Sequence, residues 1–363
     1  MKTSLYPIIL SILFCFNSAT GQTLKPGFDA DEYLGVLRRC AGQLGKAFRG
    51  DIPKETDFDK VYQSPEMGLH NRWELWVNKD RTIMAINLRG TTNDAASLFE
   101  NFYSAMIPAT GSLKPDGINP VEYKFATDPK AYVHVGWTLG LCSMLPDITE
   151  RLKIWHAKGI KQVIIEGHSQ GGVLAFLLTS HIHYKMAEGA LPNDLIIQTY
   201  CSAAPKPGNL YYAYDFDHFT RGGWAHNVVN AADWVPEMPM TVQTIKDLNQ
   251  DPFAHTRQSL RKQNFLVRYY INHIYRKLDR LTRRTQRKYQ KFLGRVLYKQ
   301  VRKYMTDLEQ PRYAASCHYV RAGVPVVLIP DEEYRRKFPD TSANIFRDHL
   351  FGPYYYLVSK TYK

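Results

Sequence analysis

The chain is poor in cysteine, with five cysteines among 363 residues. None of them forms a Cys-x-x-Cys pair, so there is no spacing typical of a structural zinc site and we expect no metal. Four cysteines remain after the first twenty residues, and both buried thiols and disulfide bridges fit them, because four cysteines allow three full pairings. These four are Cys40, Cys142, Cys201 and Cys317.

Long apolar runs are also missing, because no stretch after residue 21 has the roughly 18 consecutive apolar residues of a membrane-spanning helix. At the start of the chain, Lys2 precedes a short apolar run at 5–16, followed by small and polar residues at 17–21. This order is typical of a secretory signal peptide over residues 1–21. We therefore expect an exported protein, secreted or periplasmic, that is soluble or peripheral to a membrane.

Acidic residues are scarce in one segment. The formal net charge is +13, and residues 256–305 carry 16 lysines and arginines against one acid, Asp279. The rest of the chain is close to neutral. Proline is absent between Phe253 and Pro311, and apolar residues recur there every three or four positions. This pattern predicts one long helix or a helical hairpin over about 260–304.

Two interpretations of the basic segment stay open. Aromatic side chains among lysines and arginines suit an anionic membrane surface, which would make residues 256–305 a site of peripheral contact. The alternative is a helical cap over the core whose cations face water. We expect no nucleic acid partner for an exported chain.

Outside the basic segment, strand and helix patterns alternate, which indicates an α/β fold with a mostly parallel central sheet. We expect a core formed by residues 22–240 and completed by 313–363, with the basic helical insertion at 241–312 between them. The expected helices are at 30–46 and 139–158, the strands at 72–77, 82–88, 195–201, 227–230 and 324–329, and a loop at 108–120.

The most informative stretch is 161–172, where a β-branched run, a Gly-x-Ser-x-Gly turn and a helix-forming run follow one another. Gly167 and Gly171 allow the backbone to turn sharply, so that the hydroxyl of Ser169 is presented in front of a helix N-terminus. A chance occurrence of the motif is the alternative. The strand before it and the helix after it favour a nucleophile elbow.

A serine nucleophile needs a positioned base and an orienting carboxylate, and in this fold they follow the serine in the order acid, then histidine. Asp233 follows a short strand and is the candidate acid. Four histidines lie downstream. His255 and His273 border or lie within the basic helix, and His318 precedes the last strand. His349, in an Asp-His-Leu sequence, is the preferred base.

Six segments together resemble the class 3 lipases, the fungal-type triacylglycerol lipase branch of the α/β-hydrolases. These segments are Arg89-Gly-Thr91, Val133-His-Val-Gly-Trp137, Gly167-His-Ser-Gln-Gly171, Ala204-Pro-Lys-Pro-Gly-Asn209, the stretch from Asn230 to Pro239, and Asp348-His-Leu350.

The resemblance implies Ser169 as nucleophile, His349 as base and then acid, and Asp233 as the orienting carboxylate. It also implies an oxyanion hole made by the backbone N–H of Gln170 with the N–H and hydroxyl of Thr91. His168 is interpreted as packing within the elbow. A lipid or other ester substrate and no organic cofactor are expected.

The helix after Thr91 occupies the position of the family's lid, with Leu98 among its candidate residues and an inner face expected from Phe99, Phe102 and Met106; a plain core helix explains the same spacing. The chain departs from the family at Gln170, where leucine is common, and in the long separation of the acid and the base by the basic insertion. A non-catalytic scaffold that binds anionic membranes through its basic helix is the alternative function.

Overall fold

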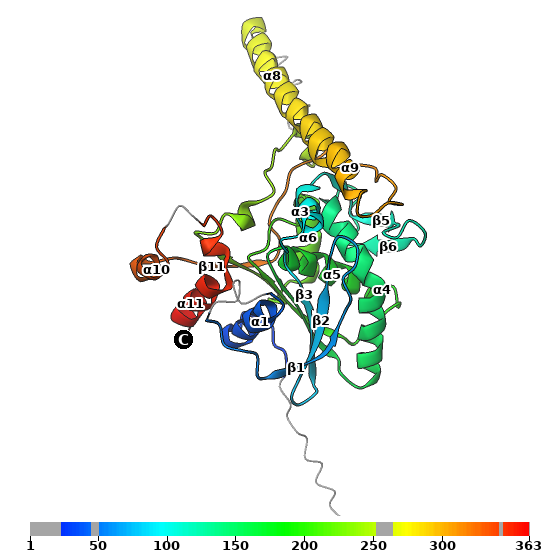
Figure 1. The fold of residues 1–363 in the computed structure, drawn as a ribbon. Helices are drawn as coiled ribbons and strands as arrows, with labels where there is room; N and C mark the ends of the chain where they lie inside the picture. Colours follow the sequence, from blue (N-terminus) through cyan, green and yellow to red (C-terminus); the bar gives the residue numbers. More distant parts are fainter. Residues whose placement is uncertain (1–22, 45–50, 252–263, 341–343, 363) are drawn as a thin grey trace, which may run out of the picture.

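A seven-stranded sheet forms the centre of the computed structural model, which describes residues 23–44, 51–251, 264–340 and 344–362 (Figure 1). The predicted signal peptide lies outside these residues. The first three strands are antiparallel, and the sheet is parallel from the third strand onward. In sheet order the strands are β1 (Phe58–Gln63), β2 (Trp73–Asn78), β3 (Ile83–Leu88), β8 (Gln162–His168), β9 (Ile196–Ser202), β10 (Ala225–Asn230) and β11 (Val324–Leu328).

Helices cover both faces of the sheet because its inner strands are apolar on both sides. In β3, Met84 and Ile86 belong to one core and Ile83 and Ala85 to the other, as the two-residue period of a strand requires. One face is covered by α4 (Val135–Ala157), α5 (Gln170–Ala187) and α6 (Leu210–Phe219), and the other by α1 (Ala30–Gly42) and α11 (Phe351–Tyr362). This topology confirms the predicted α/β-hydrolase architecture.

Two small antiparallel sheets lie beside the core. They pair β4 (Met106–Pro108) with β7 (Tyr132–His134), and β5 (Thr110–Leu113) with β6 (Val121–Lys124). The expected loop at 108–120 is therefore wrong in part. Leu113 and Tyr123 are buried in the main core, so the hairpin gains packing that its glycine and proline content does not suggest.

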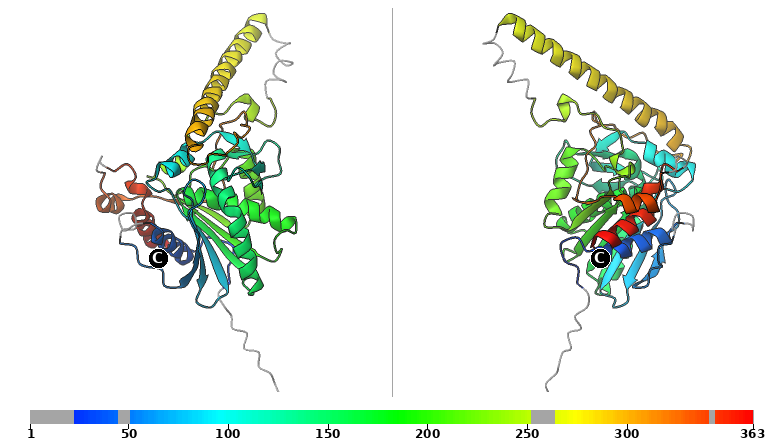
Figure 2. Two further views of the ribbon diagram at one scale, coloured as in Figure 1. Left: turned by 45° about the vertical axis from the view of Figure 1, so that its right-hand side comes forward. Right: turned by 90° about the vertical axis from the view of Figure 1, so that its left-hand side faces the viewer.

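The predicted long helix is a single rod, and the hairpin alternative is wrong for the residues that the structure describes. Helix α8 (Phe265–Gln290) continues through a π-helical segment (Lys291–Val296) into α9 (Leu297–Val301). Figures 1 and 2 show α8 projecting away from the core, with α9 at its base near α3 (Ala95–Phe102). We call Phe265–Val301 the arm. Its base is attached where the N–H of Ala105 donates to the carbonyl oxygen of Leu293 (3.1 Å).

The four described cysteines are buried and carry free thiols, which decides between the two alternatives for them. Within the described ranges, no helix is both long enough and apolar enough to cross a membrane. The remaining short elements are 3₁₀ turns at Val235–Glu237, Ile245–Asp247 and Arg347–His349, and helix α10 at Glu332–Lys337.

Candidate active site

Ser169 lies at a sharp turn between β8 and α5. Its backbone has φ 60° and ψ −126°, a strained conformation of the kind found at nucleophile elbows. The glycines on either side are required by space: a Cβ on Gly171 would lie 2.1 Å from the carbonyl oxygen of Leu88, and one on Gly167 would lie 2.2 Å from the backbone of Gly171. The motif therefore forms a sharp strand-to-helix turn with Ser169 at its apex.

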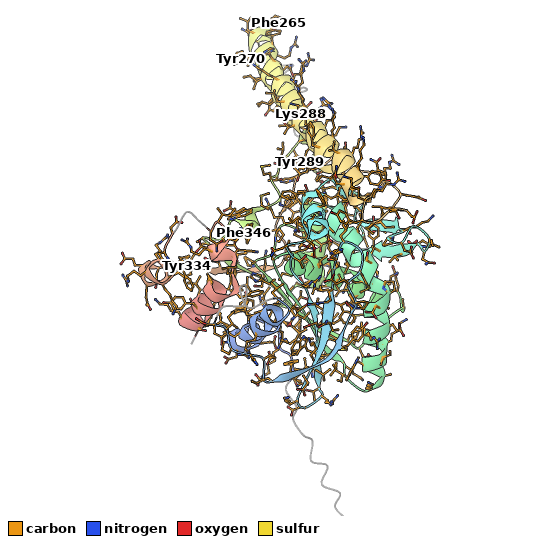
Figure 3. All side chains as sticks on the ribbon, in the orientation of Figure 1. Phe265, Tyr270, Lys288, Tyr289, Tyr334 and Phe346 are labelled. Atoms are coloured by element: carbon orange, nitrogen blue, oxygen red, sulfur yellow. The ribbon has the colours of Figure 1, made fainter. Side chains whose placement is uncertain are left out.

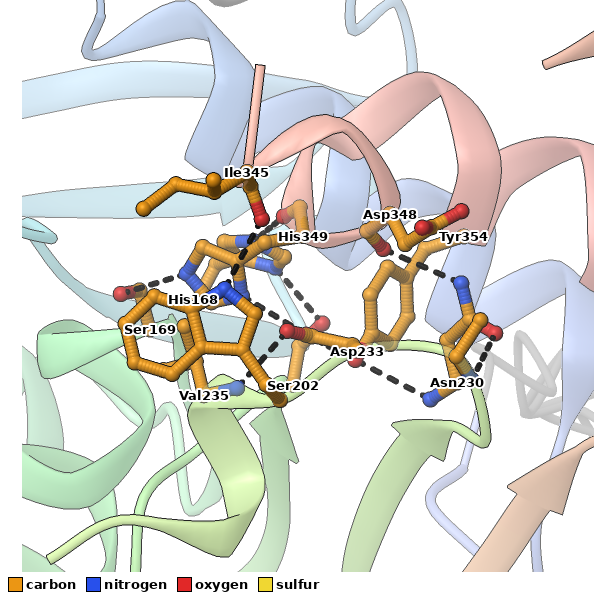
Figure 4. A network of polar contacts seen from close by, with 12 residues as sticks. His168, Ser169, Ser202, Asn230, Asp233, Val235, Ile345, Asp348, His349 and Tyr354 are labelled. Carbon is orange, nitrogen blue, oxygen red and sulfur yellow. Dashed lines mark hydrogen bonds and ion pairs between the residues drawn. The ribbon is translucent and has the colours of Figure 1, made fainter. Parts of the chain in front are cut away.

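The structure brings the three predicted residues of the triad together, although they come from distant parts of the chain (Figure 4). His349 Nε2 lies 2.8 Å from Ser169 Oγ, and His349 Nδ1 lies 2.7 Å from Asp233 Oδ2. These distances are those of hydrogen bonds. Each ring nitrogen of the histidine thus has one partner, a hydroxyl on one side and a carboxylate on the other.

Asp233 is held rigidly just beyond the end of β10, and its side chain is fully buried. The hydroxyl of Tyr354 donates to the same oxygen that faces His349 (2.8 Å), and the N–H of Val235 donates to the other oxygen (2.9 Å). Hydrogen bonds of this kind stabilise a buried carboxylate in its charged form. A charged, oriented carboxylate is what a histidine base requires.

The segment that carries His349 is fastened to the β10 end by side-chain bonds to its backbone. The amide of Asn230 donates to the carbonyl oxygen of Asp348 (3.0 Å), and the indole N–H of Trp234 donates to that of Ile345 (2.8 Å). Figure 4 shows these bonds beside the triad. Residues on either side of the acid therefore also place the base.

His168, next to Ser169 in the chain, contacts the backbone of His349. Its Nε2 lies 2.8 Å from the carbonyl oxygen of His349, so this nitrogen must donate, and Nδ1 must accept from the hydroxyl of Ser202 (2.9 Å). The oxygen of Ser202 also lies 2.6 Å from the hydroxyl of Tyr33. Burial lowers the pKa of His168 to about 3, which keeps the ring neutral. His168 therefore packs within the turn, as predicted, and also holds the backbone of His349 by a hydrogen bond.

Thr91 and Gln170 lie on the other side of Ser169 and contact each other. The backbone N–H of Gln170 is among the first in α5, where N–H groups have no partner within the helix. The hydroxyl of Thr91 donates to Gln170 Oε1 (3.0 Å) and accepts from the amide of Asn101 (2.9 Å). In this arrangement the hydroxyl proton of Thr91 is already engaged.

The expected inner face of the lid helix is wrong for Phe102 and Met106 and holds only for Phe99, which packs against the main core. Leu98 and Phe102 are 43% and 57% exposed, and Met106 lies beyond α3, buried in β4. Phe99 is half-buried and its ring lies 6.2 Å from that of Tyr304, just after the arm. The buried residues of α3 are Ala96, Ser97 and Glu100. Polar partners inside the protein determine this orientation, whereas the apolar spacing also placed the exposed Leu98 and Phe102 on the inner face.

Of the other candidate bases that the structure describes, neither takes the place of His349 beside Ser169. His273 is exposed on α8, and His255 lies outside the described residues. His318 is half-buried in the segment after the arm, where its backbone N–H donates to the hydroxyl of Ser316 (3.2 Å).

Several supporting residues were not anticipated from the sequence. Glu100 could have been found, because a carboxyl side chain within an apolar helical pattern indicates a buried polar group that needs a hydrogen-bond partner. The others had no local signal, because their partners are distant in the chain: Tyr33, Asn71, Asn101, Ser202 and Tyr354.

Comparisons with known proteins agree with the motifs. The class 3 lipase family model matches residues 85–243, which confirms the resemblance over this part of the chain. Five of the six motifs fall within the match, and Asp348-His-Leu350 lies outside it.

One curated relative is a secreted mono- and diacylglycerol lipase from Malassezia globosa, 29% identical over 228 residues. The aligned region covers 62% of this chain and 64% of the relative, so the chain spans just under two thirds of that protein's length. Among solved structures, the chain is similar to a triacylglycerol lipase from Penicillium expansum (19% identity, TM-score 0.43, covering 58% of this chain and 75% of that one). It is also similar to the Rhizomucor miehei lipase in its propeptide complex (17%, TM-score 0.41, 59% and 64%).

Proposed function

We propose that this chain is an exported serine hydrolase that cleaves carboxylic esters of lipids through an acyl-enzyme. The observation that carries the proposal is the continuous line of contacts from Ser169 through His349 to Asp233, placed at the N-terminus of α5. The family match and the secreted lipase relative support the substrate class and export.

In the first half of the proposed reaction, His349 Nε2 takes the hydroxyl proton of Ser169 while the serine oxygen attacks the ester carbonyl carbon. Asp233 stabilises the imidazolium that forms, since its oxygen is already 2.7 Å from Nδ1. The imidazolium then gives its proton to the leaving alcohol. In the second half, water attacks the acyl group with His349 again as the base, and Ser169 is restored.

The negative charge of each tetrahedral intermediate would be stabilised by the backbone N–H groups of Gln170 and Thr91. Removal of one oxyanion donor typically costs about 3–4 kcal/mol of transition-state stabilisation. The dipole of α5 adds to this effect, because its positive end lies at Ser169.

The test is hydrolysis of matched p-nitrophenyl butyrate and palmitate by the mature protein beside Ser169→Ala. We expect turnover by the wild type that is lost in the variant, with an unchanged melting temperature. A higher kcat/KM for palmitate supports lipid esters as substrates, and a higher value for butyrate contradicts them. If a folded wild type hydrolyses neither ester, the scaffold alternative replaces the enzyme.

We also propose that residues 241–312 are inserted between the two parts of the core, 22–240 and 313–363, and that the arm contacts anionic membrane surfaces. Exposed apolar side chains run along it, and Figure 3 shows Phe265, Tyr270 and Lys288 on α8. The exposed apolar residues that share one side at helical spacing are Val267, Tyr270, Ile274, Leu278, Leu281, Phe292 and Val296.

A basic stripe lies on nearly the opposite side of the helix from the apolar one. Arg276, Arg280, Arg283 and Arg287 recur every three or four residues and line a hollow of about 310 Å³ together with Asp279. Asp279 is the only acid in α8 and pairs with Arg283. The other three arginines of this stripe form no ion pair with any residue that the structure describes, which leaves them to external phosphate groups. A helix lying in a membrane surface places an apolar face among acyl chains and basic residues at headgroups.

Membrane contact is tested by sedimentation with phosphatidylserine-containing vesicles, using Ser169→Ala protein so that catalysis cannot alter the lipid. We expect neutralisation of Arg276, Arg280 and Arg287 to glutamine to weaken binding at least about tenfold, since each basic residue near a surface contributes about 1 kcal/mol. The matched control neutralises Arg335, Arg336 and Lys337, which are exposed on α10. Equal losses in the two triple variants, or equal binding to neutral vesicles, contradict a membrane role for the arm.

A further inference from the structure

Gln170 is the residue after the nucleophile, and its side chain is buried in a polar network. Its Oε1 accepts from the hydroxyls of Thr91 (3.0 Å) and Ser97 (3.3 Å). Its Nε2 donates to Glu100 Oε1 (2.8 Å) and Asn71 Oδ1 (3.2 Å). All four polar positions of the amide group are therefore used. We call these five residues the Gln170 network.

The direction of each hydrogen bond around Thr91 follows from donor chemistry. The indole N–H of Trp137 can only donate, and it bonds Asn101 Oδ1 (2.8 Å). The amide nitrogen of Asn101 therefore faces Thr91 Oγ1 (2.9 Å), which must accept. The hydroxyl proton of Thr91 is then directed to Gln170. The side chain of Gln170 thus holds the hydroxyl of Thr91, and these are the two residues expected to form the oxyanion hole.

Glu100 anchors this network to α3 from a fully buried position. Its second oxygen accepts from the amide of Asn71 (2.6 Å). Helix α4 leaves space for it with two glycines: a Cβ on Gly136 would lie 2.0 Å from the backbone oxygen of Glu100, and one on Gly140 would lie 2.3 Å from Oε1. Such close backbone approach fixes α3 against α4.

We infer that the Gln170 side chain is a positioning group that sets the spacing of the oxyanion-hole donors, and that its bond to Glu100 makes α3 a fixed wall of the site. Helix α3 then does not act as a mobile apolar lid. This inference rests on the proposed ester hydrolase function for its kinetic consequence, whereas the fixed position of α3 is independent of catalysis.

The kinetic test compares Gln170→Leu with the wild type on p-nitrophenyl butyrate, with active sites counted by a fluorophosphonate. Leucine keeps the backbone N–H of residue 170 but removes the acceptor of the Thr91 hydroxyl. We therefore expect kcat per active site to fall about tenfold or more while KM stays within about twofold. This is the pattern of a group that contributes only in the transition state. An unchanged kcat overturns the positioning role.

A second comparison separates positioning from simple stability. Replacing both partners, Gln170→Leu with Glu100→Leu, also removes the buried Glu100 oxygen that the single variant leaves without its donor, so we expect the melting temperature to recover relative to Gln170→Leu. Thr91 stays unheld in the double variant, and kcat should remain low. Recovery of kcat together with stability would show a structural role only and overturn the inference.

A matched control uses another buried hydrogen bond on α5. Thr179→Val removes the bond between the hydroxyls of Thr179 and Thr199 (2.8 Å), away from Ser169. We expect a lower melting temperature with kcat per active site unchanged. A loss of kcat equal to that of Gln170→Leu would contradict a specific effect of the Gln170 network.

Hydrogen exchange measures the position of α3 without using catalysis. We expect the amides of residues 98–102, which are hydrogen-bonded within α3, to exchange slowly in the wild type and at least about tenfold faster in Glu100→Leu, because local opening then breaks fewer bonds. Fast exchange in the wild type contradicts the fixed wall. If the wild type hydrolyses no ester, the proposed function fails, and slow exchange would still support the fixed α3.

Discussion

The buried polar network around Ser169 and the exposed arm place their side chains in opposite ways. Near Ser169, groups such as Glu100 and His168 are buried and bonded on both sides. Along α8, large apolar residues such as Phe265 and Leu266 are more than half exposed. Buried polar groups without partners and exposed apolar groups are both unfavourable. Near Ser169, the buried polar groups have hydrogen-bond partners. On α8, the large apolar side chains remain exposed, and an external surface would bury the apolar stripe.

This contrast also separates the two proposed activities. The triad and the Gln170 network depend on rigid internal geometry, whereas arm binding depends on apolar area and charge that are already on the surface. Changes in one region should therefore leave the other unaffected.

The largest effect is expected for Asp233→Asn. The amide cannot accept as the carboxylate does, so His349 is held in the wrong tautomer, and kcat should fall about 10⁴-fold. The measurement is p-nitrophenyl butyrate hydrolysis per active site. Vesicle binding by the arm should be unchanged, and a loss of both properties would contradict the independence of the two regions.

A large loss of stability is expected for Arg39→Met. Arg39 makes two bonds to Glu166 (2.8 and 2.7 Å) and one to Glu55 (3.0 Å), and all three side chains are buried. Removing one partner of a buried ion pair typically costs about 3–5 kcal/mol, because the remaining charge is unpaired. Urea unfolding measures the difference.

The matched control for Arg39 is an exposed pair. Lys79 contacts Asp59 at the surface, and Lys79→Met should lower the free energy of unfolding by less than about 1 kcal/mol. Similar losses in the two variants would show that burial does not determine the strength of these pairs.

A smaller, pH-dependent effect is expected from Glu100. Burial raises the pKa of this carboxyl to about 8, against the opposing hydrogen bonds from Asn71 and Gln170. The folded state then holds a proton that the unfolded state releases above its ordinary pKa near 4.5, so the contribution of Glu100 to stability is lost as pH rises toward 8. Urea unfolding at pH 5 to 9 should show a shallower decline for Glu100→Gln. Parallel curves for the two proteins would contradict this.

The smallest effect is expected from salt. Raising sodium chloride from about 0.05 to 0.5 M screens exposed charges, so vesicle binding by the arm should weaken. Hydrolysis of the soluble butyrate ester should change by less than about twofold, since the one charged side chain of the triad, Asp233, is buried and screened little by salt. Equal responses of binding and hydrolysis would contradict the division between the two regions.

Much of the candidate site was predictable because its signals are local in the chain. The elbow around Ser169 needs two glycines at fixed positions, and the strand and helix periods identify its setting. Asp233 and His349 were predictable from chain order and the family resemblance. The orientation of α3 was not, since Leu98 and Phe102 have the spacing of an inner face and yet lie outside.

The sequence by itself predicted the parallel sheet, the turn at Ser169 and the helical arm. Residue periodicity indicates the strands and the helix, and the two glycines indicate the turn. These features depend on near neighbours in the chain. The tertiary structure alone decided which face of α3 is buried and how Tyr33, Tyr354 and Asn71 support the site. Their hydrogen bonds join residues 29 to 169 positions apart, and no local pattern reports which distant group will satisfy a buried donor or acceptor.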